Sequence, residues 1–277
     1  MDSSDLHLAI DYVGSCGIVL TPEQKATLNT TLTILRHENK FSYVSFWGII
    51  RGINGDYFIA QGIGKDVLKE KTNLYSKDCT TWGLLPVPGK QDIEKSKLFK
   101  MRLTGDPSHE SEYVEVKQMP GEGDELVETE ELITMKEEDR LAAIIYRMEE
   151  EVVIVPRGAF IRMYNGQVVR NKSFEGLTCA EASKLLSYFH CRPPVNMSNK
   201  PLAERAKLDK AIDFLDTIED DNPEGCWVIQ FERGGNLVLV KSLLWIGYVL
   251  YHLPSTNKYG SIYVGTGEYN IDLPFMI

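Results

Sequence analysis

The chain has 277 residues, 43% of them hydrophobic, and a formal net charge of −10. This length and composition can bury a core without disulfides, so they argue against a wholly disordered chain. They predict a single subunit over residues 1–277, either as one domain or as two closely packed lobes. The acidic, glycine-bearing residues 120–124 are the best candidate for a break between such lobes. The acidic balance repels phosphate backbones and argues against nucleic-acid binding.

The first predicted element is a helix over residues 22–38. Thr21 and Gln24 have the spacing of a capping box, and Pro22 suits the first helical position. Leucines then recur at helical spacing, at Leu28, Leu32 and Leu35. We therefore expect an amphipathic helix near the N-terminus.

The stretch SFWGIIRGINGDYFIAQG, residues 45–62, holds four glycines among aromatic and β-branched residues. A phosphate-binding loop needs a helix directly after its glycines, whereas residues 56–60 have strand character again. The pattern therefore predicts a β-hairpin. Asn54 and Gly55 can supply the two positive-φ residues of a type I′ turn between its strands.

Two further hairpins are predicted. Asn165-Gly166 separates two short strands in GAFIRMYNGQVVRNKSF, and Gly234-Gly235 joins two longer ones in WVIQFERGGNLVLVKSLLW. The most apolar run, residues 236–253, is interrupted by Lys241, and its β-branched and aromatic residues favour buried strands over a membrane span. Because hairpins close antiparallel pairs, we expect an α+β fold with mostly antiparallel sheets and several packed helices.

Helices are predicted between these hairpins. Residues 136–151, KEEDRLAAIIYRMEEE, combine an acidic N-terminal end with an apolar stripe. Thr178 and Glu181 form a second capping box, and the apolar spacing extends that helix to residue 189. Residues 208–225 predict a short helix followed by an acidic turn.

Acidic residues are concentrated between residues 120 and 140, where only Lys136 opposes them before Arg140. The nine are Glu122, Asp124, Glu125, Glu128, Glu130, Glu131, Glu137, Glu138 and Asp139. Two interpretations stay open. One is a solvated loop that leads into a helix, and the other is an electrostatic docking strip for a basic partner.

No pattern of reactive residues stands out, so we expect no catalytic, cofactor or metal site. The five cysteines lack C-x-x-C spacing, which predicts reduced thiols in a cytosolic compartment. The first ten residues have no signal-peptide pattern. His190 and Cys191 are adjacent in sequence and therefore point differently in space, so a catalytic pair is not expected. The glycine-rich residues 264–268 lie too near the end of the chain for a βαβ nucleotide unit.

Aromatic residues are the more informative signal. The tryptophans Trp47, Trp82, Trp227 and Trp245 lie in or beside predicted strands, and tyrosines crowd the last quarter of the chain. Such rings either pack in a core or form interface hot spots. Hairpins and aromatic rings without a reactive group are typical of a binding or structural component.

Eight sequence blocks, taken in order, resemble the radial spoke head protein 9 family and span nearly the whole chain. They are FWGIIRGINGDYFIAQG (46–62), WGLLP (82–86), LTGDPSHESEY (103–113), KEEDRLAAII (136–145), VPRGAF (155–160), FEGLTCAEASKLLSYFHCRPP (174–194), SLLWIGYVLYH (242–252) and YGSIYVGTGEYNIDLPFMI (259–277). One departure is Ile246, where the family carries proline. Because isoleucine can donate to a β ladder and proline cannot, strand pairing there can differ from the family's.

The resemblance implies a non-enzymatic subunit of the radial spoke head in the axoneme of motile cilia and flagella, made in the cytoplasm. It implies assembly with radial spoke head 4/6-type subunits and other head proteins, in a head that faces the central-pair apparatus and relays its contact toward the dynein arms. It implies no cofactor, metal or catalytic residue, no nucleic acid and no membrane, and it assigns no partner-binding residue.

Two other functions remain as alternatives. A small-molecule enzyme of unknown type would need a pocket in which titratable groups converge. A cytosolic adaptor outside cilia would differ in its location in the cell.

Overall fold

The computed structural model describes residues 1–3, 5–120 and 126–276, with the backbone alone for residues 115–120, 126–131 and 198. Within these residues the centre of the molecule is an eight-stranded sheet. Its strands, in spatial order, are β11 (Trp227–Glu232), β12 (Leu237–Ser242), β13 (Tyr248–His252), β14 (Tyr259–Gly265), β1 (Tyr43–Arg51), β2 (Asp56–Ile63), β3 (Lys71–Ser76) and β4 (Gly83–Leu84).

One parallel pair joins two antiparallel halves of this sheet. β1 lies parallel to β14 at Gly48↔Tyr263, Ile49↔Val264 and Ile50↔Gly265, and every other pair of neighbours in the described sheet is antiparallel. Strands from the first third and the last quarter of the chain thus share one sheet. The expected α+β fold with mostly antiparallel sheets is confirmed.

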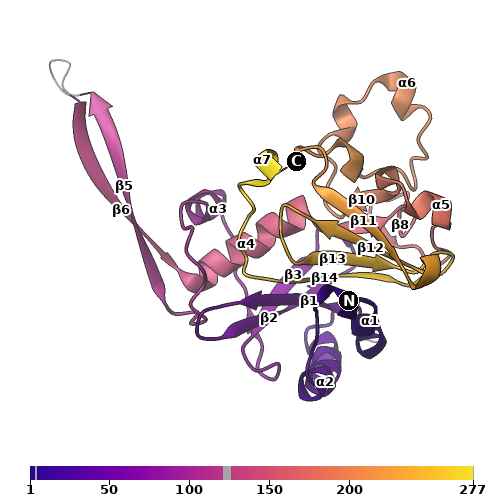
Figure 1. Cartoon of the computed structure of the whole chain (residues 1–277), viewed down its shortest axis with the longest axis horizontal. Helices are drawn as coiled ribbons and strands as arrows, with labels where there is room; N and C mark the ends of the chain where they lie inside the picture. Colours follow the sequence, from indigo (N-terminus) through magenta and orange to yellow (C-terminus); the bar gives the residue numbers. More distant parts are fainter. Residues whose placement is uncertain (4, 121–125, 277) are drawn as a thin grey trace.

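Helices cover both faces of the sheet (Figure 1). α4 (Glu137–Glu151) lies on one face, while α1 (Leu6–Tyr12) and α2 (Pro22–Glu38) lie on the other. Alternate residues of β2 pack on the two faces of the sheet, because successive strand residues point to opposite faces. Tyr57 and Ile59 pack in the cluster that contains α4, and Phe58 and Ala60 pack in the cluster that contains α2. The sheet is therefore buried on both sides.

The predicted N-terminal helix is confirmed with its bounds. The Thr21 hydroxyl accepts a hydrogen bond from the Gln24 N–H at 3.2 Å, and the Gln24 side chain accepts one from the Thr21 N–H at 3.0 Å. Leu28, Leu32 and Leu35 are buried, as the spacing predicts. The helix over residues 136–151 is confirmed as α4.

The predicted β1–β2 hairpin is confirmed, but its type I′ turn is wrong. Neither Asn54 nor Gly55 has a positive φ, and residues 52–55 form a longer connection. The N–H of Ile53 donates to Leu103 at 2.9 Å and that of Asn54 to Thr104 at 2.8 Å, both to backbone carbonyls. Hydrogen bonds to a segment fifty residues away therefore set this turn, and the local Asn-Gly signal is overridden.

The other two hairpins are confirmed. β8 (Phe160–Arg162) pairs with β9 (Val168–Arg170), and β11 pairs with β12. At Gly166, Gly234 and Gly235 the backbone has positive φ, which glycine adopts without strain. Ile246 lies between β12 and β13, outside both strands, and the pairing difference from the family stays a prediction.

One predicted helix is shorter than expected. α5 spans only Cys179–Ala182; a 3₁₀ turn over Leu185–Ser187 follows, and residues 188–190 form β10 (Tyr188–His190), which pairs with β7 (Ile154–Pro156). The capping box of Thr178 and Glu181 is present, but residues 188–190 pair with β7 and do not continue the helix.

The short helix expected after residue 208 is wrong. The described segment has one 3₁₀ turn, Ile218–Asp220, preceded by α6 (Leu202–Arg205) and a second 3₁₀ turn, Met197–Asn199. The Asp213 carboxylate accepts from the Asp209 N–H at 3.1 Å, and that of Asp216 accepts from the Val195 N–H at 2.7 Å. Aspartates that bind backbone amides compete with helix formation, which explains the difference.

A two-stranded arm projects from the body (Figure 1). β5 (Glu110–Pro120) and β6 (Leu126–Lys136) pair in an unbroken register from Glu110↔Lys136 to Pro120↔Leu126. Part of the predicted acidic loop is therefore a strand. Residues 121–125, which include most of the predicted break between lobes, lie outside the described residues, so that break stays a prediction.

The remaining elements are short. They are α3 (Lys90–Ser96), α7 (Leu273–Met276) and the 3₁₀ turns Gly14–Cys16 and Arg233–Gly235. In the described part of the chain, no helix has the length and apolarity needed to cross a bilayer.

Candidate functional site

The start of the chain forms a wedge between two strands of the sheet. β1 and β14 pair only over Gly48–Ile50, and residues 1–3 enter beside the part of β1 that precedes this pairing. The Met1 amino group donates to the Phe46 carbonyl at 2.7 Å and to the Ser261 carbonyl at 3.0 Å, and the Phe46 N–H donates to the Met1 carbonyl at 2.8 Å. Residues 1–3 thereby form hydrogen bonds with backbone groups of β1 and β14 where these two strands are not paired with each other.

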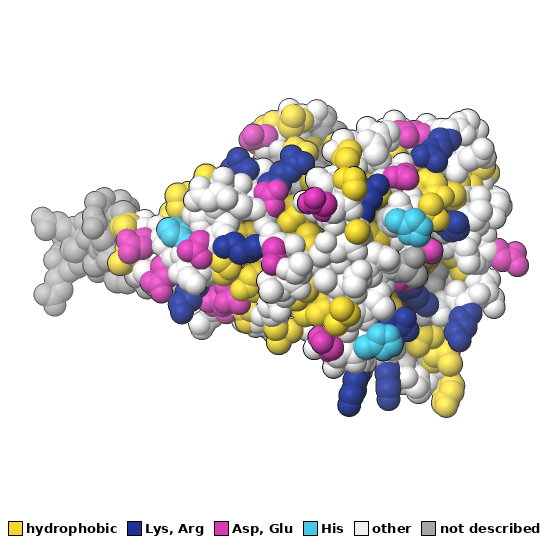
Figure 2. Space-filling view, turned by 90° about the horizontal axis from the view of Figure 1, so that it is seen from below, with side chains coloured by type: hydrophobic (Ala, Val, Ile, Leu, Met, Phe, Trp, Pro, Cys, Tyr) yellow, Lys and Arg dark blue, Asp and Glu magenta, His cyan; other side chains and the backbone are white. Residues whose placement is uncertain are grey.

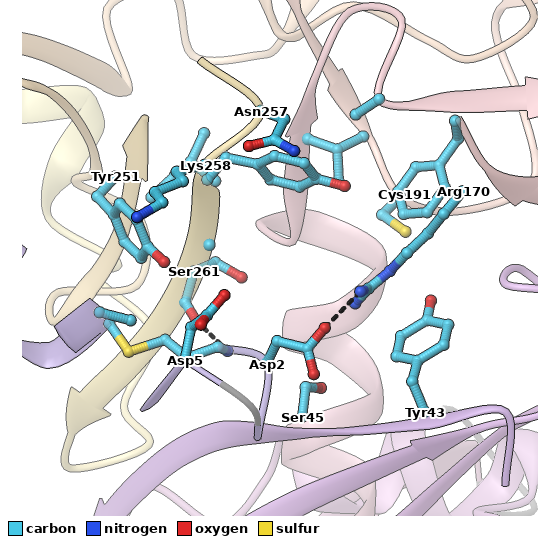
Figure 3. Close-up of a pocket in the computed structure, with 18 of the residues that line it drawn as sticks. Asp2, Asp5, Tyr43, Ser45, Arg170, Cys191, Tyr251, Asn257, Lys258 and Ser261 are labelled. Atoms are coloured by element: carbon cyan, nitrogen blue, oxygen red, sulfur yellow. Dashed lines mark hydrogen bonds and ion pairs between the residues drawn. The ribbon is translucent and has the colours of Figure 1, made fainter. Parts of the chain in front are cut away.

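A cavity of about 580 Å³ opens beside this wedge (Figure 3). Its walls come from residues 1–12, from β1 and β2, from residues 153–191 and from β13, β14 and their connection. In the close-up, Arg170 and Asp2 point toward one another, with the Tyr43 ring next to them. Asn257 and Lys258 lie on the opposite side, so the cavity is formed by segments distant in sequence.

An ion pair and an aromatic ring hold one wall of the cavity together. The Arg170 guanidinium pairs with the Asp2 carboxylate and lies 3.7 Å from the centre of the Tyr43 ring, in the geometry of a cation–π contact. Burial raises the pKa of the Tyr43 hydroxyl, although the nearby Arg170 charge opposes this. At neutral pH this wall presents a neutral phenol and a paired arginine.

Burial shifts the pKa of the titratable groups of the cavity, and it keeps the thiol and the phenol in their protonated forms. Burial raises the pKa of the Cys191 thiol, so it stays protonated, whereas a nucleophilic cysteine needs a lowered pKa. Burial also raises the pKa of Tyr259 to about 12 and lowers that of the Met1 amino group to about 5. The arrangement can bind a chain segment or a small molecule, but it has no thiolate.

The structure separates His190 from Cys191. The His190 Nε2 lies 2.9 Å from both carboxylate oxygens of Asp221, and the Trp227 indole N–H donates to the same carboxylate at 2.8 Å. Cys191 lines the cavity instead. The side chains of residues 190 and 191 therefore lie in two different environments. No three His, Cys, Asp or Glu side chains that could hold a metal ion come together among the described residues.

The aromatic residues singled out in the sequence mainly build the core. Trp47, Trp227 and Trp245 are buried, and so are Tyr248 and Tyr263. Apolar surface is provided instead by scattered exposed residues, among them Val87, Tyr164, Ile246 and Phe275. In Figure 2 one face of the body carries charged side chains of both signs, interspersed with apolar ones.

His252 fixes the connection that forms one rim of the cavity. Its Nε2 accepts from the Leu177 N–H at 3.1 Å, so Nδ1 carries the proton and donates to the Lys258 carbonyl at 3.2 Å. The side chain is fully buried, and burial lowers its pKa from 6.5 to about 4. His252 is therefore neutral in the folded chain at pH 7.

We expect this histidine to make the fold sensitive to acid. Between pH 6.5 and pH 4 the unfolded chain takes up a proton that the folded chain does not, so stability falls as the pH falls. The free energy of unfolding should fall by about 2–3 kcal/mol between pH 7 and pH 4.5 because of this proton. Urea unfolding at both pH values should show that His252→Gln loses less stability than the wild type when the pH is lowered from 7 to 4.5. His7→Gln, at an exposed histidine, should match the wild type, and an unchanged pH dependence in His252→Gln would contradict the assignment.

Comparison with known proteins adds a family. A family model described as radial spokehead-like protein matches residues 1–131. Proteins called radial spoke head protein 9 homolog are 46% identical over 278 residues in Danio rerio and 44% identical over 277 residues in both Bos taurus and Homo sapiens, and each alignment covers 100% of both chains.

The chain belongs to the radial spoke head protein 9 family. Membership in this family makes it a structural component of the radial spoke, in the axoneme of cilia and flagella, and a protein that associates with other radial spoke components. The family resemblance noted in the sequence is thus confirmed. The wedge, the cavity and the arm are features of a radial spoke head family member.

Proposed function

We propose that the chain is a non-enzymatic scaffold of the spoke head, which supports head assembly and helps to relay contact between the central pair and the dynein arms. The observation that carries this proposal is the family match over the full length of the chain. The raised thiol pKa in the cavity is in keeping with a binding role and gives little support to the alternative of a small-molecule enzyme.

The partner we propose is a radial spoke head 4/6-type subunit, bound at the β11 edge of the sheet. β11 has β12 on one side only, and its side chains Val228 and Phe231 are exposed. The edge at the other end of the sheet, β4, is just two residues long. Because an open strand edge pairs readily with another strand, the longer edge is the better candidate for a partner's strand.

A pull-down with matched variants tests this proposal. The chain is co-expressed with a radial spoke head 4/6-type subunit, once as wild type and once as Val228→Lys/Phe231→Lys. We expect the double variant to retain at least tenfold less partner, because two cations on the edge oppose strand addition. The control is Leu8→Lys/Ile34→Lys, which alters two similarly exposed apolar residues on α1 and α2. Failure of the wild type to retain the subunit would refute the partner, and full retention by the β11 variant would refute the site.

A second experiment addresses the location. A fluorescently tagged chain expressed in a motile ciliated cell should label the axoneme along the cilium, and its loss should alter the beat. Uniform cytosolic fluorescence would favour the alternative of an adaptor outside cilia.

A further inference from the structure

The cavity beside the N-terminal wedge has an apolar wall that belongs to the hydrophobic core. Ile63, Val67, Val155 and Phe160 are buried members of one core cluster, and the same four residues line the cavity. This wall is therefore held in place by packing. The cavity volume of about 580 Å³ lies within the range of pockets that hold small molecules, roughly 300–1,000 Å³.

Hydrogen-bond donors without acceptors gather at another part of the cavity, where Tyr43 and Arg170 lie together (Figure 3). The Tyr43 hydroxyl is buried, and its proton has no acceptor in the part of the chain that the structure describes. Arg170 pairs with Asp2 through Nη1, whereas its Nε and Nη2 groups donate to none of the described residues. Because a buried donor without an acceptor is costly, a ligand that brings an acceptor to this place would be stabilised.

Positive charge exceeds negative charge on the cavity walls. The cations are Arg170, Lys172 and Lys258, and the carboxylates are Asp2 and Asp5. Within the described residues, neither lysine forms an ion pair. The terminal amine adds no charge at pH 7, because burial lowers its pKa to about 5. Three cations thus line the cavity with two carboxylates, in a chain whose net charge is −10, so the cavity favours one added negative charge.

We propose that this cavity binds a small amphipathic anion, a long-chain carboxylate of the fatty-acid type. Its carboxylate accepts from the Tyr43 hydroxyl and from the N–H groups that Arg170 does not use for Asp2, and its alkyl tail lies on the apolar wall. A phosphate dianion fits less well, because only one cation of the cavity exceeds the carboxylates. The proposal goes beyond the scaffold function above, and no residue of the cavity belongs to β11.

Such a ligand would connect segments that are distant in the chain. It would contact β1 through Tyr43, the β8–β9 hairpin through Arg170, and the segment before β8 through Val155. A ligand that binds the folded chain and not the unfolded chain raises the Tm by mass action. Binding should therefore be visible both as heat and as thermal stabilisation.

The test uses dodecanoate as the probe, kept below its micelle concentration. It is titrated into the full chain by calorimetry, and thermal melting is followed in parallel. We expect the Tm to rise with dodecanoate concentration. Each CH₂ added between octanoate and dodecanoate should lower the Kd by about fourfold, since each buries further apolar area. Methyl dodecanoate, which has the tail without the charge, should bind at least tenfold more weakly.

Tyr43→Phe tests the contact with the carboxylate. It removes one donor but keeps the ring on which the Arg170 guanidinium lies, so dodecanoate should bind about tenfold more weakly. Without ligand this variant should be no less stable than the wild type, because it removes a buried hydroxyl whose proton has no acceptor among the described residues. The control is Tyr164→Phe, at a tyrosine that is 99% exposed, and it should bind like the wild type.

Photo-crosslinking locates the bound ligand. A dodecanoate with a diazirine on its tail should label peptides from residues 153–174, which contribute to the apolar wall. Label confined to exposed apolar residues such as Phe275 would show non-specific adsorption and would overturn the proposal.

Three further results would overturn it. They are a wild type that does not bind dodecanoate, equal affinity for the acid and its methyl ester, and a folded Tyr43→Phe variant that binds like the wild type. Calorimetry uses the chain alone, whereas the pull-down requires the radial spoke head 4/6-type subunit. A failed ligand site and a failed subunit contact are therefore distinguishable.

Discussion

Replacing Glu137 with alanine should lower the free energy of unfolding by about 4 kcal/mol, since it removes one buried carboxylate that four donors share. The carboxylate accepts from the Tyr57 hydroxyl, the Thr104 N–H, the Thr104 hydroxyl and the Gly105 N–H, each at 2.7 Å. Tyr57 and Gly105 are buried, so their donors would be left without water or partner. Urea unfolding measures the loss, and hydrogen exchange at Gly105 should report the released segment.

The stability difference between the wild type and Glu137→Ala should depend on pH. Burial raises the pKa of Glu137, but the hydrogen bonds from Tyr57, Thr104 and Gly105 outweigh it and hold the pKa below 4.5. The stabilisation is therefore complete above about pH 4.5 and is lost as the pH falls through the lower pKa of the folded chain. The difference between wild type and Glu137→Ala should shrink in that acid range.

The matched control is Asp139→Asn, which removes a neighbouring charge from the first turn of α4. Both substitutions weaken the favourable interaction of acids with the helix N-terminus, which is worth less than about 1 kcal/mol. Equal losses in the two variants would show that helix charge, and not the four hydrogen bonds, accounts for the effect.

Substituting Gly48 with alanine should be at least as damaging, with a loss of about 4 kcal/mol and a fall in Tm of about 10 °C. Gly48 has φ +156°, and a Cβ there would lie 2.1 Å from the Tyr263 carbonyl oxygen. Gly48 and Tyr263 are partners in the parallel pairing of β1 and β14. Since backbone atoms cannot step aside as a flexible side chain can, the two halves of the sheet must separate locally. Thermal melting by circular dichroism measures the effect.

Gly55→Ala provides the comparison within the same hairpin. A Cβ at Gly55 meets nothing within 4 Å, and its φ is not positive. We expect a change of no more than about 0.5 kcal/mol. If Gly48→Ala were tolerated as well as Gly55→Ala, the close approach of β1 to Tyr263 would be wrong.

The sequence by itself determined the local elements and the family. The capping boxes at Thr21 and Thr178, the three glycine hairpins and the stripe of α4 depend on residues close together in the chain, so local spacing is sufficient to predict them. Composition also indicated a binding or structural component, since no reactive pattern was present.

Only the tertiary structure decided how these elements combine. The turn at residues 52–55 follows hydrogen bonds to residues 103–104, residues 188–190 join β7 instead of extending a helix, and residues 1–3 lie between β1 and β14. The tertiary structure also decides the separation of His190 from Cys191 and the direction of the arm. Each depends on partners tens to hundreds of residues away, and the free energy of such contacts is set by packing and backbone pairing that no local window of sequence contains.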